Sequence, residues 1–214
     1  MSAPAAPRRI GLLGGSFDPP HLAHRALAQL AVQELALDEL RWLPAGMPWQ
    51  KAGRRLAPAA HRLAMLGLLV SGQPRQQIDA RELLRAGPTY TLDTVQDLQS
   101  ERECAGAPAA DWLLILGQDQ YARIDTWQQW QALLPLVTLA VAGRAGQAPQ
   151  APPALAGVAH RRVLLDLPPL AISSSEVRRL CAAGQPVDAL VGPAVARYID
   201  QHHLYLPDNR LASP

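Results

Sequence analysis

Short apolar runs alternate with segments of helical periodicity along most of the chain, and few folds accommodate such an alternation. The expected strands are brief apolar segments, several of them bounded by Gly or Pro: residues 9–13, 40–43, 77–80, 112–116, 137–142 and 163–165. Strands this short and this apolar suit a parallel sheet that helices cover on both faces. We therefore predict an α/β fold with a doubly wound, Rossmann-like parallel sheet.

The expected helices carry apolar residues at intervals of three and four positions. They span residues 21–35, 58–70, 91–103 and 127–134 between the strands, and residues 174–183 and 193–203 after the last strand. The last two helices follow one another without an intervening strand, which indicates a small helical C-terminal subdomain from about residue 173. Residues 143–157 are rich in Pro and Gly and have no clear period, so we expect a long surface loop there.

Length and composition favour one folded domain. The chain has 214 residues, of which 49% are hydrophobic and 18% charged. This supply of apolar side chains is enough to bury a core and excludes a wholly disordered chain. We expect a single domain over residues 9–206, with flexible tails at residues 1–8 and 207–214.

The charge balance and the cysteines restrict the partners and the compartment. Twenty Lys and Arg residues against 18 Asp and Glu residues give a net charge of +2, too little for the basic field that binds nucleic acid non-specifically. No apolar run approaches the roughly 18 residues of a membrane span, and the first eight residues lack the apolar stretch of a signal peptide. Cys104 and Cys181 are too few for a disulfide framework. We expect a cytoplasmic protein without a nucleic-acid or membrane partner.

The turn after the first expected strand reads Gly14-Gly-Ser-Phe-Asp-Pro-Pro-His21-Leu-Ala-His24. Glycines let a backbone approach a ligand closely, and Asp18-Pro19 resembles a helix N-cap followed by proline. The two histidines, three positions apart, would project from the first helical turn, where free N–H groups attract anions. The pattern suits a polyphosphate, although a tight turn with two surface histidines, or a zinc-binding pair, has the same pattern. Neither GxxxxGK[ST] nor GxGxxG is present, which argues against a P-loop enzyme and a dehydrogenase.

A second candidate phosphate site, Ile172-Ser-Ser-Ser-Glu-Val-Arg178, lies near the C-terminus. Ser173 and Glu176 have the spacing of a capping box, which predicts the start of a helix. Three hydroxyls, unpaired N–H groups and the planar fork of Arg178 would also bind a phosphate tail. A plain helix cap and a phosphate site both fit this segment.

Together, the two motifs resemble those of the bacterial nicotinate-nucleotide adenylyltransferases, which have a histidine-rich turn near the N-terminus and an Ile-Ser-Ser-Thr-x-x-Arg helix near the C-terminus. Other stretches within residues 9–206 match this family in order: Pro44 to Pro48, Glu82 to Thr91, Gly117 to Asp119, and Thr126-Trp127. The resemblance implies transfer of the adenylyl group of ATP to nicotinate mononucleotide, giving nicotinate adenine dinucleotide and pyrophosphate in NAD biosynthesis. It also implies a doubly wound α/β nucleotidyltransferase domain and a need for Mg²⁺, held mainly through the ATP phosphates.

The resemblance assigns roles to individual residues. The expected catalytic residues are His21, His24 and Arg178, because the joining of two anionic phosphates calls for charge neutralisation and in-line placement. The expected ATP-binding residues are Gly14, Gly15, Ser16, Phe17, Gly117, Asp119, Ser173, Ser174 and Arg178. The expected nicotinate-mononucleotide-binding residues are Lys51, Tyr90, Thr91, Trp127 and Arg144. No metal ligand is assigned.

The chain departs from the family pattern at a few positions. Ala23 stands where the family has the Gly of His-x-Gly-His, and Gln50 stands where the family has the His of Pro-Pro-His-Lys. Two alternatives therefore remain: another small-molecule adenylyl- or cytidylyltransferase of the same superfamily, such as one acting on phosphopantetheine, and a nucleotide sensor without turnover. The pairs Tyr90-Thr91 and Thr126-Trp127 favour a flat aromatic acid as the acceptor.

Overall fold

A computed structural model describes residues 6–46, 56–143 and 149–207. Within these ranges the chain forms a six-stranded sheet, parallel at every pairing, of order β3-β2-β1-β4-β5-β6. The strands are β1 Arg8–Gly15, β2 Glu39–Pro44, β3 Gln76–Ile78, β4 Ala110–Gly117, β5 Thr138–Ala142 and β6 Arg161–Leu165. This order is that of the doubly wound Rossmann fold, which confirms the predicted fold class. All six predicted strands are present, although β1 extends two residues further than predicted and β3 ends two residues earlier.

Helices connect the six strands, and three more helices follow the last strand within the described residues. The longer helices are α1 Leu22–Glu34, α2 Ala59–Val70, α4 Thr91–Cys104, α7 Ser174–Ala182 and α9 Pro193–Gln201. The shorter ones are α3 Arg81–Leu84, α5 Gln118–Tyr121, η2 Ile124–Thr126, α6 Trp130–Leu133, η3 Leu134–Leu136, η4 Pro153–Leu155 and α8 Asp188–Val191. The prediction of one helix over 127–134 is wrong. Gln129 has a positive φ of 52°, which a right-handed helix cannot include, so the segment divides into separate short turns.

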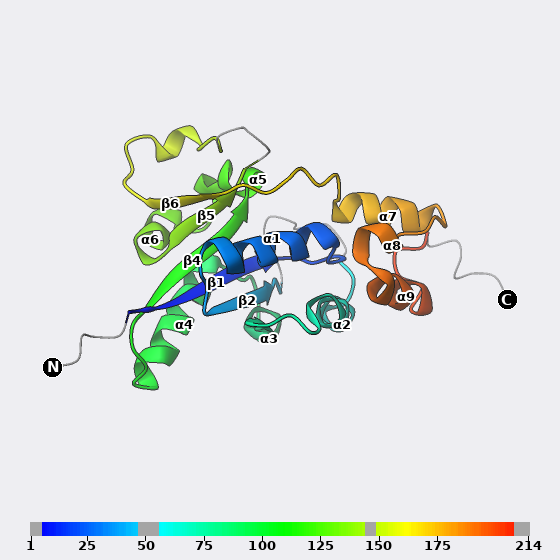
Figure 1. The fold of residues 1–214 in the computed structure, drawn as a ribbon, viewed down its shortest axis with the longest axis horizontal. Coiled ribbons are helices and arrows are strands. Elements are labelled where there is room, and N and C mark those ends of the chain that lie inside the picture. The colour runs from blue at the N-terminus through cyan, green and yellow to red at the C-terminus, as the bar shows by residue number, and fades with distance from the viewer. Residues whose placement is uncertain (1–5, 47–55, 144–148, 208–214) are drawn as a thin grey trace.

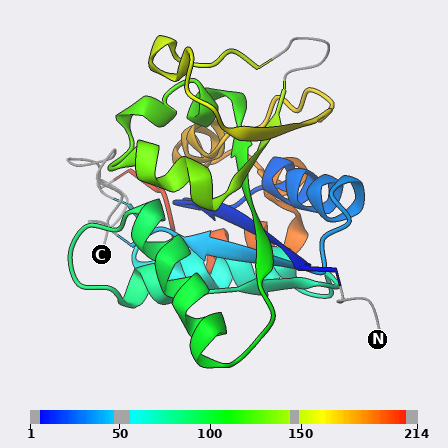
Figure 2. The same cartoon turned by 90° about the vertical axis from the view of Figure 1, so that its left-hand side faces the viewer.

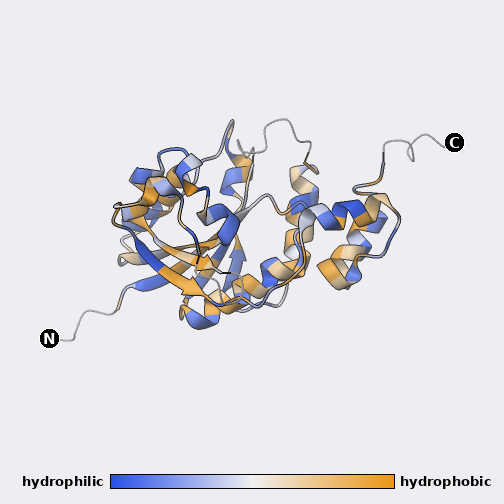
Figure 3. Cartoon of the chain, turned by 90° about the horizontal axis from the view of Figure 1, so that it is seen from above, coloured by the Kyte–Doolittle hydropathy of each residue, from blue (hydrophilic) through white to orange (hydrophobic). Residues whose placement is uncertain are grey.

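Alternate residues of the central strand β4 enter two separate cores, one on each face of the sheet. Leu113 and Ile115 pack with α1, α2 and the C-terminal helices, whereas Leu114 and Leu116 pack with α4 and α6. The alternation follows from the two-residue period of a strand, and coverage of both faces explains why the strand is apolar throughout. Figure 2 shows α1 and α4 on opposite faces of the sheet, and Figure 3 shows the hydrophobic residues concentrated on the strands.

The helices α7, α8 and α9 gather at one end of the molecule, beyond the sheet (Figure 1), and form the predicted helical C-terminal subdomain. Their apolar faces, including Val177, Cys181, Val195 and Ile199, join the same core as α1 and α2. No helix in the described ranges is long and apolar enough to cross a membrane.

A buried arginine joins the loops that follow the first two strands. Arg62 of α2 is 2% exposed. Its Nη1 donates to the carbonyl oxygens of Ser16 at 2.7 Å and Ala45 at 2.8 Å, and its Nε donates to that of Ala57 at 3.1 Å. Burial lowers the pKa of Arg62, and the negative charge of Asp18 opposes that shift. One guanidinium thus fixes the turn after β1, the loop after β2 and the start of α2.

We expect Arg62→Leu to lower the free energy of unfolding by about 3–5 kcal/mol, because it removes a positive charge whose field acts on the buried Asp18 carboxylate and leaves three carbonyls without their donor. Urea denaturation measures the loss, and Arg197→Leu, at an exposed position of α9, is the matched control. A loss below about 1 kcal/mol, the range of an ordinary surface substitution, would contradict this role.

Candidate active site

A cavity of about 750 Å³ lies at the carboxyl ends of β1 and β4, where ligands bind in open parallel sheets. Most of the predicted site residues line it, although they come from segments far apart in the sequence. They are Gly14, Gly15, Ser16, Phe17, His21, His24, Tyr90, Thr91, Gly117, Asp119, Trp127 and Ser174. Ser173 and Arg178 do not line the cavity, and Lys51 and Arg144 lie outside the described residues.

The two glycines of the first motif end β1 rather than forming a turn, which corrects the sequence interpretation. A side chain at Gly15 would begin 3.0 Å from the ring of Phe17 and press against it. Phe17 has a positive φ of 45°, a strained conformation for a bulky residue. Its buried ring packs edge-on against His24 and Trp42, with centroids 5.1 and 5.4 Å away. The Phe17 side chain is therefore a packing element of the turn.

The helix α1 begins at Leu22 with His21 as its N-cap, so the prediction of an N-cap at Asp18 is wrong. His24 reaches back to this N-cap, where its Nδ1 accepts a hydrogen bond from the backbone N–H of His21 at 3.2 Å. The two imidazoles stack with centroids 3.6 Å apart. Because Nδ1 accepts, the neutral ring of His24 carries its proton on Nε2 and can donate from that atom.

His21 is 6% exposed, and its Nδ1 has no hydrogen-bond partner among the residues that the structure describes. Burial lowers its pKa from 6.5 to about 4, because the charged form loses its hydration. His21 is therefore neutral near pH 7. Without a bound ligand it can therefore offer an anion a hydrogen-bond donor.

The start of α7 is attached to the histidine turn. Ser174 donates its hydroxyl to the carbonyl oxygen of Pro19 at 2.9 Å, and Arg178 donates from Nη1 to the carbonyl oxygen of Asp18. These contacts join residues 155 and 160 positions apart. Both candidate phosphate sites therefore lie beside one another at a single cavity.

Ser173 is the predicted N-cap of α7, and its hydroxyl accepts from the N–H of Glu176 at 3.2 Å. The carboxylate of Glu176 instead pairs with Arg179 at 2.7 Å on the outer surface of the helix. Since Ser173 caps the helix and does not line the cavity, its predicted contact with ATP stays a prediction.

The sequence around Asp18 does not predict the buried contacts that its carboxylate makes. Its carboxylate is 1% exposed and accepts hydrogen bonds from the Tyr205 hydroxyl at 2.9 Å and from the N–H of Ala57 at 3.2 Å. A guanidinium nitrogen of Arg178 lies 3.9 Å from its other oxygen. Burial and the nearby carboxylate raise the pKa of Tyr205, so its hydroxyl keeps its proton. Asp18 thus ties the end of the chain to the histidine turn.

Aromatic and polar side chains from residues 90–91 and 117–127 also line the cavity. Tyr90 is the N-cap residue of α4 and Thr91 is its first residue. Trp127 follows η2, and its buried indole N–H makes no hydrogen bond within the described part of the chain. Gly117 ends β4 and Asp119 lies in the first turn of α5. The cavity is thus lined both by the histidine turn and by aromatic side chains.

Several lining residues had no predicted role. Ala23 lines the cavity, so the methyl group that replaces the family glycine lies in its wall. Glu82 begins the stretch to Thr91 that matches the family, but the sequence assigns it no role. Gln118 also lines the cavity and exchanges two hydrogen bonds of 3.2 Å with the backbone of Gln150. Residues 167–171 line the cavity as well, and no local pattern predicts this because only the fold brings them there.

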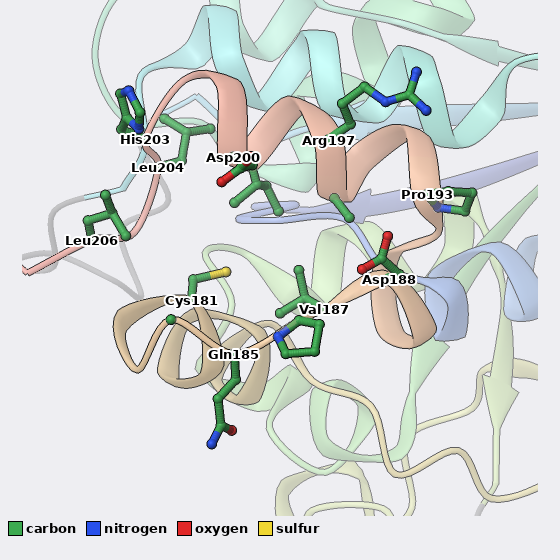
Figure 4. Close-up of a pocket in the computed structure, with 14 residues that line it drawn as sticks. Cys181, Gln185, Val187, Asp188, Pro193, Arg197, Asp200, His203, Leu204 and Leu206 are labelled. Carbon is green, nitrogen blue, oxygen red and sulfur yellow. The ribbon is translucent and has the colours of Figure 1, made fainter.

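A second cavity, of about 680 Å³, lies in the C-terminal subdomain and contains none of the predicted site residues. Figure 4 shows Cys181 and Val187 between α7 and α9, with Arg197 pointing away from them. Among the described residues, no group of three or more His, Cys, Asp or Glu side chains there or elsewhere is arranged to hold a metal ion.

The comparisons with known proteins place this arrangement in a class of nucleotidyltransferases. Residues 12–180 match the cytidylyltransferase-like family. The chain is 50% identical over 204 residues to a probable nicotinate-nucleotide adenylyltransferase of Methylibium petroleiphilum, covering 94% of this chain and 93% of the relative. It is 48% identical to a protein of the same description from Bordetella petrii, covering 92% and 99%. The chain belongs to the nicotinate-nucleotide adenylyltransferase family.

A solved structure shares the fold at low sequence identity. The nicotinic acid mononucleotide adenylyltransferase of Plasmodium falciparum, crystallised with NaAD, superposes with a TM-score of 0.73 at 20% identity. The match covers 92% of this chain and 97% of the other. The relatives from Methylibium petroleiphilum and Bordetella petrii confirm the predicted family and the predicted enzyme class, and the solved structure agrees in fold.

The lowered pKa of His21 predicts a pH-dependent stability. The unfolded chain binds the proton near pH 6.5 and the folded chain only near pH 4, so stability is complete above pH 6.5 and falls as the pH drops towards 4. Between pH 7 and pH 5 we expect His21 to account for a loss of about 2 kcal/mol in unfolding free energy. Urea denaturation at both pH values, with His21→Asn as the reference, isolates this contribution. An equal loss in both proteins would contradict it.

Proposed function

We propose that this chain transfers the adenylyl group of ATP to nicotinate mononucleotide and releases pyrophosphate. The observation that carries the proposal is the single cavity, which the histidine turn and Ser174 of α7 line together with the aromatic residues Tyr90 and Trp127. Its volume of about 750 Å³ lies in the usual range for small-molecule sites. The family membership of the chain supports the same reaction.

In the proposed reaction, a phosphate oxygen of nicotinate mononucleotide attacks the α-phosphorus of ATP, and the bond to the β-phosphate oxygen breaks. Both reactants are anionic, so the chief task of the protein is to place them in line and stabilise the added charge. His24 donates from Nε2, and neutral His21 adds a second donor. Arg178 supplies a positive charge beside the histidine turn for the departing pyrophosphate.

The remaining predicted residues divide between the two nucleotides. Gly14, Gly15, Ser16 and the backbone of Phe17 border the phosphates, and Gly117 and Asp119 bind the ribose. Tyr90 and Trp127 pack on the nicotinate ring, and Thr91 hydrogen-bonds to its carboxylate. The positions of these residues along one cavity support the assignment. Lys51 and Arg144 are proposed as basic contacts to the nicotinate mononucleotide.

We propose that magnesium binds together with ATP. Of the residues that the structure describes, Asp119 and Glu82 are the carboxylates that line the cavity. Asp119 is assigned to ribose, and Glu82 accepts a hydrogen bond from Thr94. Such a site would suit a Mg²⁺ ion that enters with ATP, and bound there it would offset the charge of the triphosphate.

We also propose a cytoplasmic location and a single domain over residues 9–206. Both cysteines are free, and Cys104 is exposed, as is usual for proteins of a reducing compartment. The two cores lie on opposite faces of one sheet, which supports folding as one unit.

An acceptor panel tests the function. Purified protein is given ATP and Mg²⁺ with nicotinate mononucleotide, nicotinamide mononucleotide or phosphopantetheine, and pyrophosphate release is measured. We expect nicotinate mononucleotide to react fastest and the amide to react at least about 100-fold more slowly, because an amide leaves the groups that bind the carboxylate unpaired. Faster reaction with phosphopantetheine would reject the assignment, and no release with any acceptor would favour a nucleotide sensor.

We expect His24→Ala to lower kcat by at least about 100-fold, because it removes a donor aimed at charge that develops in the transition state. Stopped-time assays of pyrophosphate release measure the effect, with thermal unfolding as a check on the fold. His203→Ala, an exposed position in the C-terminal subdomain, is the control. Unchanged turnover in His24→Ala would refute the role.

A further inference from the structure

Glu82 is a buried carboxyl group in the cavity wall that the proposed reaction does not use. It belongs to α3, is 8% exposed and lines the same cavity as the two histidines. A buried carboxylate costs free energy unless hydrogen bonds and a positive charge compensate it. The contacts of Glu82 therefore indicate what it does.

A chain of hydrogen bonds leads from an arginine to Glu82. The Thr94 hydroxyl donates to Oε1 of Glu82 at 2.8 Å, and Arg85 donates from Nη1 to the same Thr94 oxygen at 3.3 Å. The other end of the Arg85 guanidinium pairs with Asp97. Thr94 is fully buried in the first turn of α4. Each bond in this chain polarises the next, so the hydroxyl of Thr94 has one fixed orientation.

The charges around Glu82 act in opposite directions. Burial raises its pKa, and the Thr94 hydrogen bond, the positive charge of Arg85 and the nearby Thr89 hydroxyl counteract that rise, while the charge of Asp79 adds to it. Thr94 follows Tyr90 and Thr91 in the first turn of α4. The carboxyl group of Glu82 thus holds the helical turn that contains the predicted acceptor contacts.

The backbone of Glu82 contacts a third segment. A side chain at Gly46, in the loop after β2, would begin 2.1 Å from the carbonyl oxygen of Glu82 and 3.3 Å from the methyl group of Thr89. Such an approach is possible only for glycine. Glu82 therefore lies where the loop after β2, α3 and the start of α4 meet beside the cavity.

We propose that Glu82 is a positioning residue for the acceptor nucleotide: through the hydroxyl of Thr94 it fixes the start of α4, and with it Tyr90 and Thr91, the residues proposed to contact the nicotinate. The inference rests on the proposed function for the identity of the acceptor. It assigns to Glu82 and Thr94 an effect on acceptor binding and none on ATP binding.

Thr94 offers a matched pair of variants. Thr94→Val keeps the shape of the side chain and removes the hydroxyl, whereas Thr94→Ser keeps the hydroxyl. We expect Thr94→Val to raise the KM for nicotinate mononucleotide by about tenfold or more, because a hydrogen bond to a buried charge is lost. The KM for ATP should change by less than about twofold, and Thr94→Ser should restore most of the acceptor affinity.

Two further variants keep the test decisive if Thr94→Val folds poorly. Glu82→Gln retains an amide oxygen for Thr94 and removes the charge, so it should raise the same KM selectively. Glu101→Gln is the control, since Glu101 is an exposed acid of α4 that pairs with Arg81 at 2.7 Å. An unchanged acceptor KM, or an equal rise in the KM for both substrates, would overturn the proposal. If the wild-type protein uses nicotinate mononucleotide, either of these results rejects the role of Glu82 but not the proposed function. If the wild-type protein is inactive with nicotinate mononucleotide, the proposed function itself is rejected.

Discussion

The contact between the start of α7 and the turn after β1 makes one site out of two ends of the chain. Ser174 binds the carbonyl of Pro19, and Arg178 binds that of Asp18. The intervening sheet brings the strand ends together, and this contact places the start of α7 in the wall of the cavity. Since side chains from both ends of the chain line one cavity, neither motif alone defines the site.

Buried charges hold the site in place before any ligand binds. Arg62 fixes three loop carbonyls, and Asp18 accepts hydrogen bonds from Tyr205 and from the backbone of Ala57. Each of these ions would be costly in isolation and is compensated by the other's field and by hydrogen bonds. A hydrogen bond also holds His24 in place, because its Nδ1 accepts from the backbone N–H of His21. Groups fixed in this way need little reorganisation when charge develops on a bound phosphate.

Local periodicity predicts the parallel sheet, the fold class and the longer helices, because the spacing of apolar residues can be read from the sequence alone. The break at Gln129 was missed because its positive φ arises from the surrounding structure. The N-cap was placed at Asp18, since an Asp before Pro is a common helix start, yet tertiary contacts with Tyr205 and Ala57 take its carboxylate instead. Motif resemblance found most of the cavity wall. It could not find the contacts of Arg62 or Glu82, which join segments that only the folded chain brings together.

A crystal structure of the protein with a non-hydrolysable ATP analogue would show whether the two ends of the chain bind one triphosphate. We expect Nε2 of His24 and the guanidinium of Arg178 both to lie within hydrogen-bond distance of phosphate oxygens of the same analogue. A bound analogue whose phosphates contact only one of these two side chains would contradict this expectation.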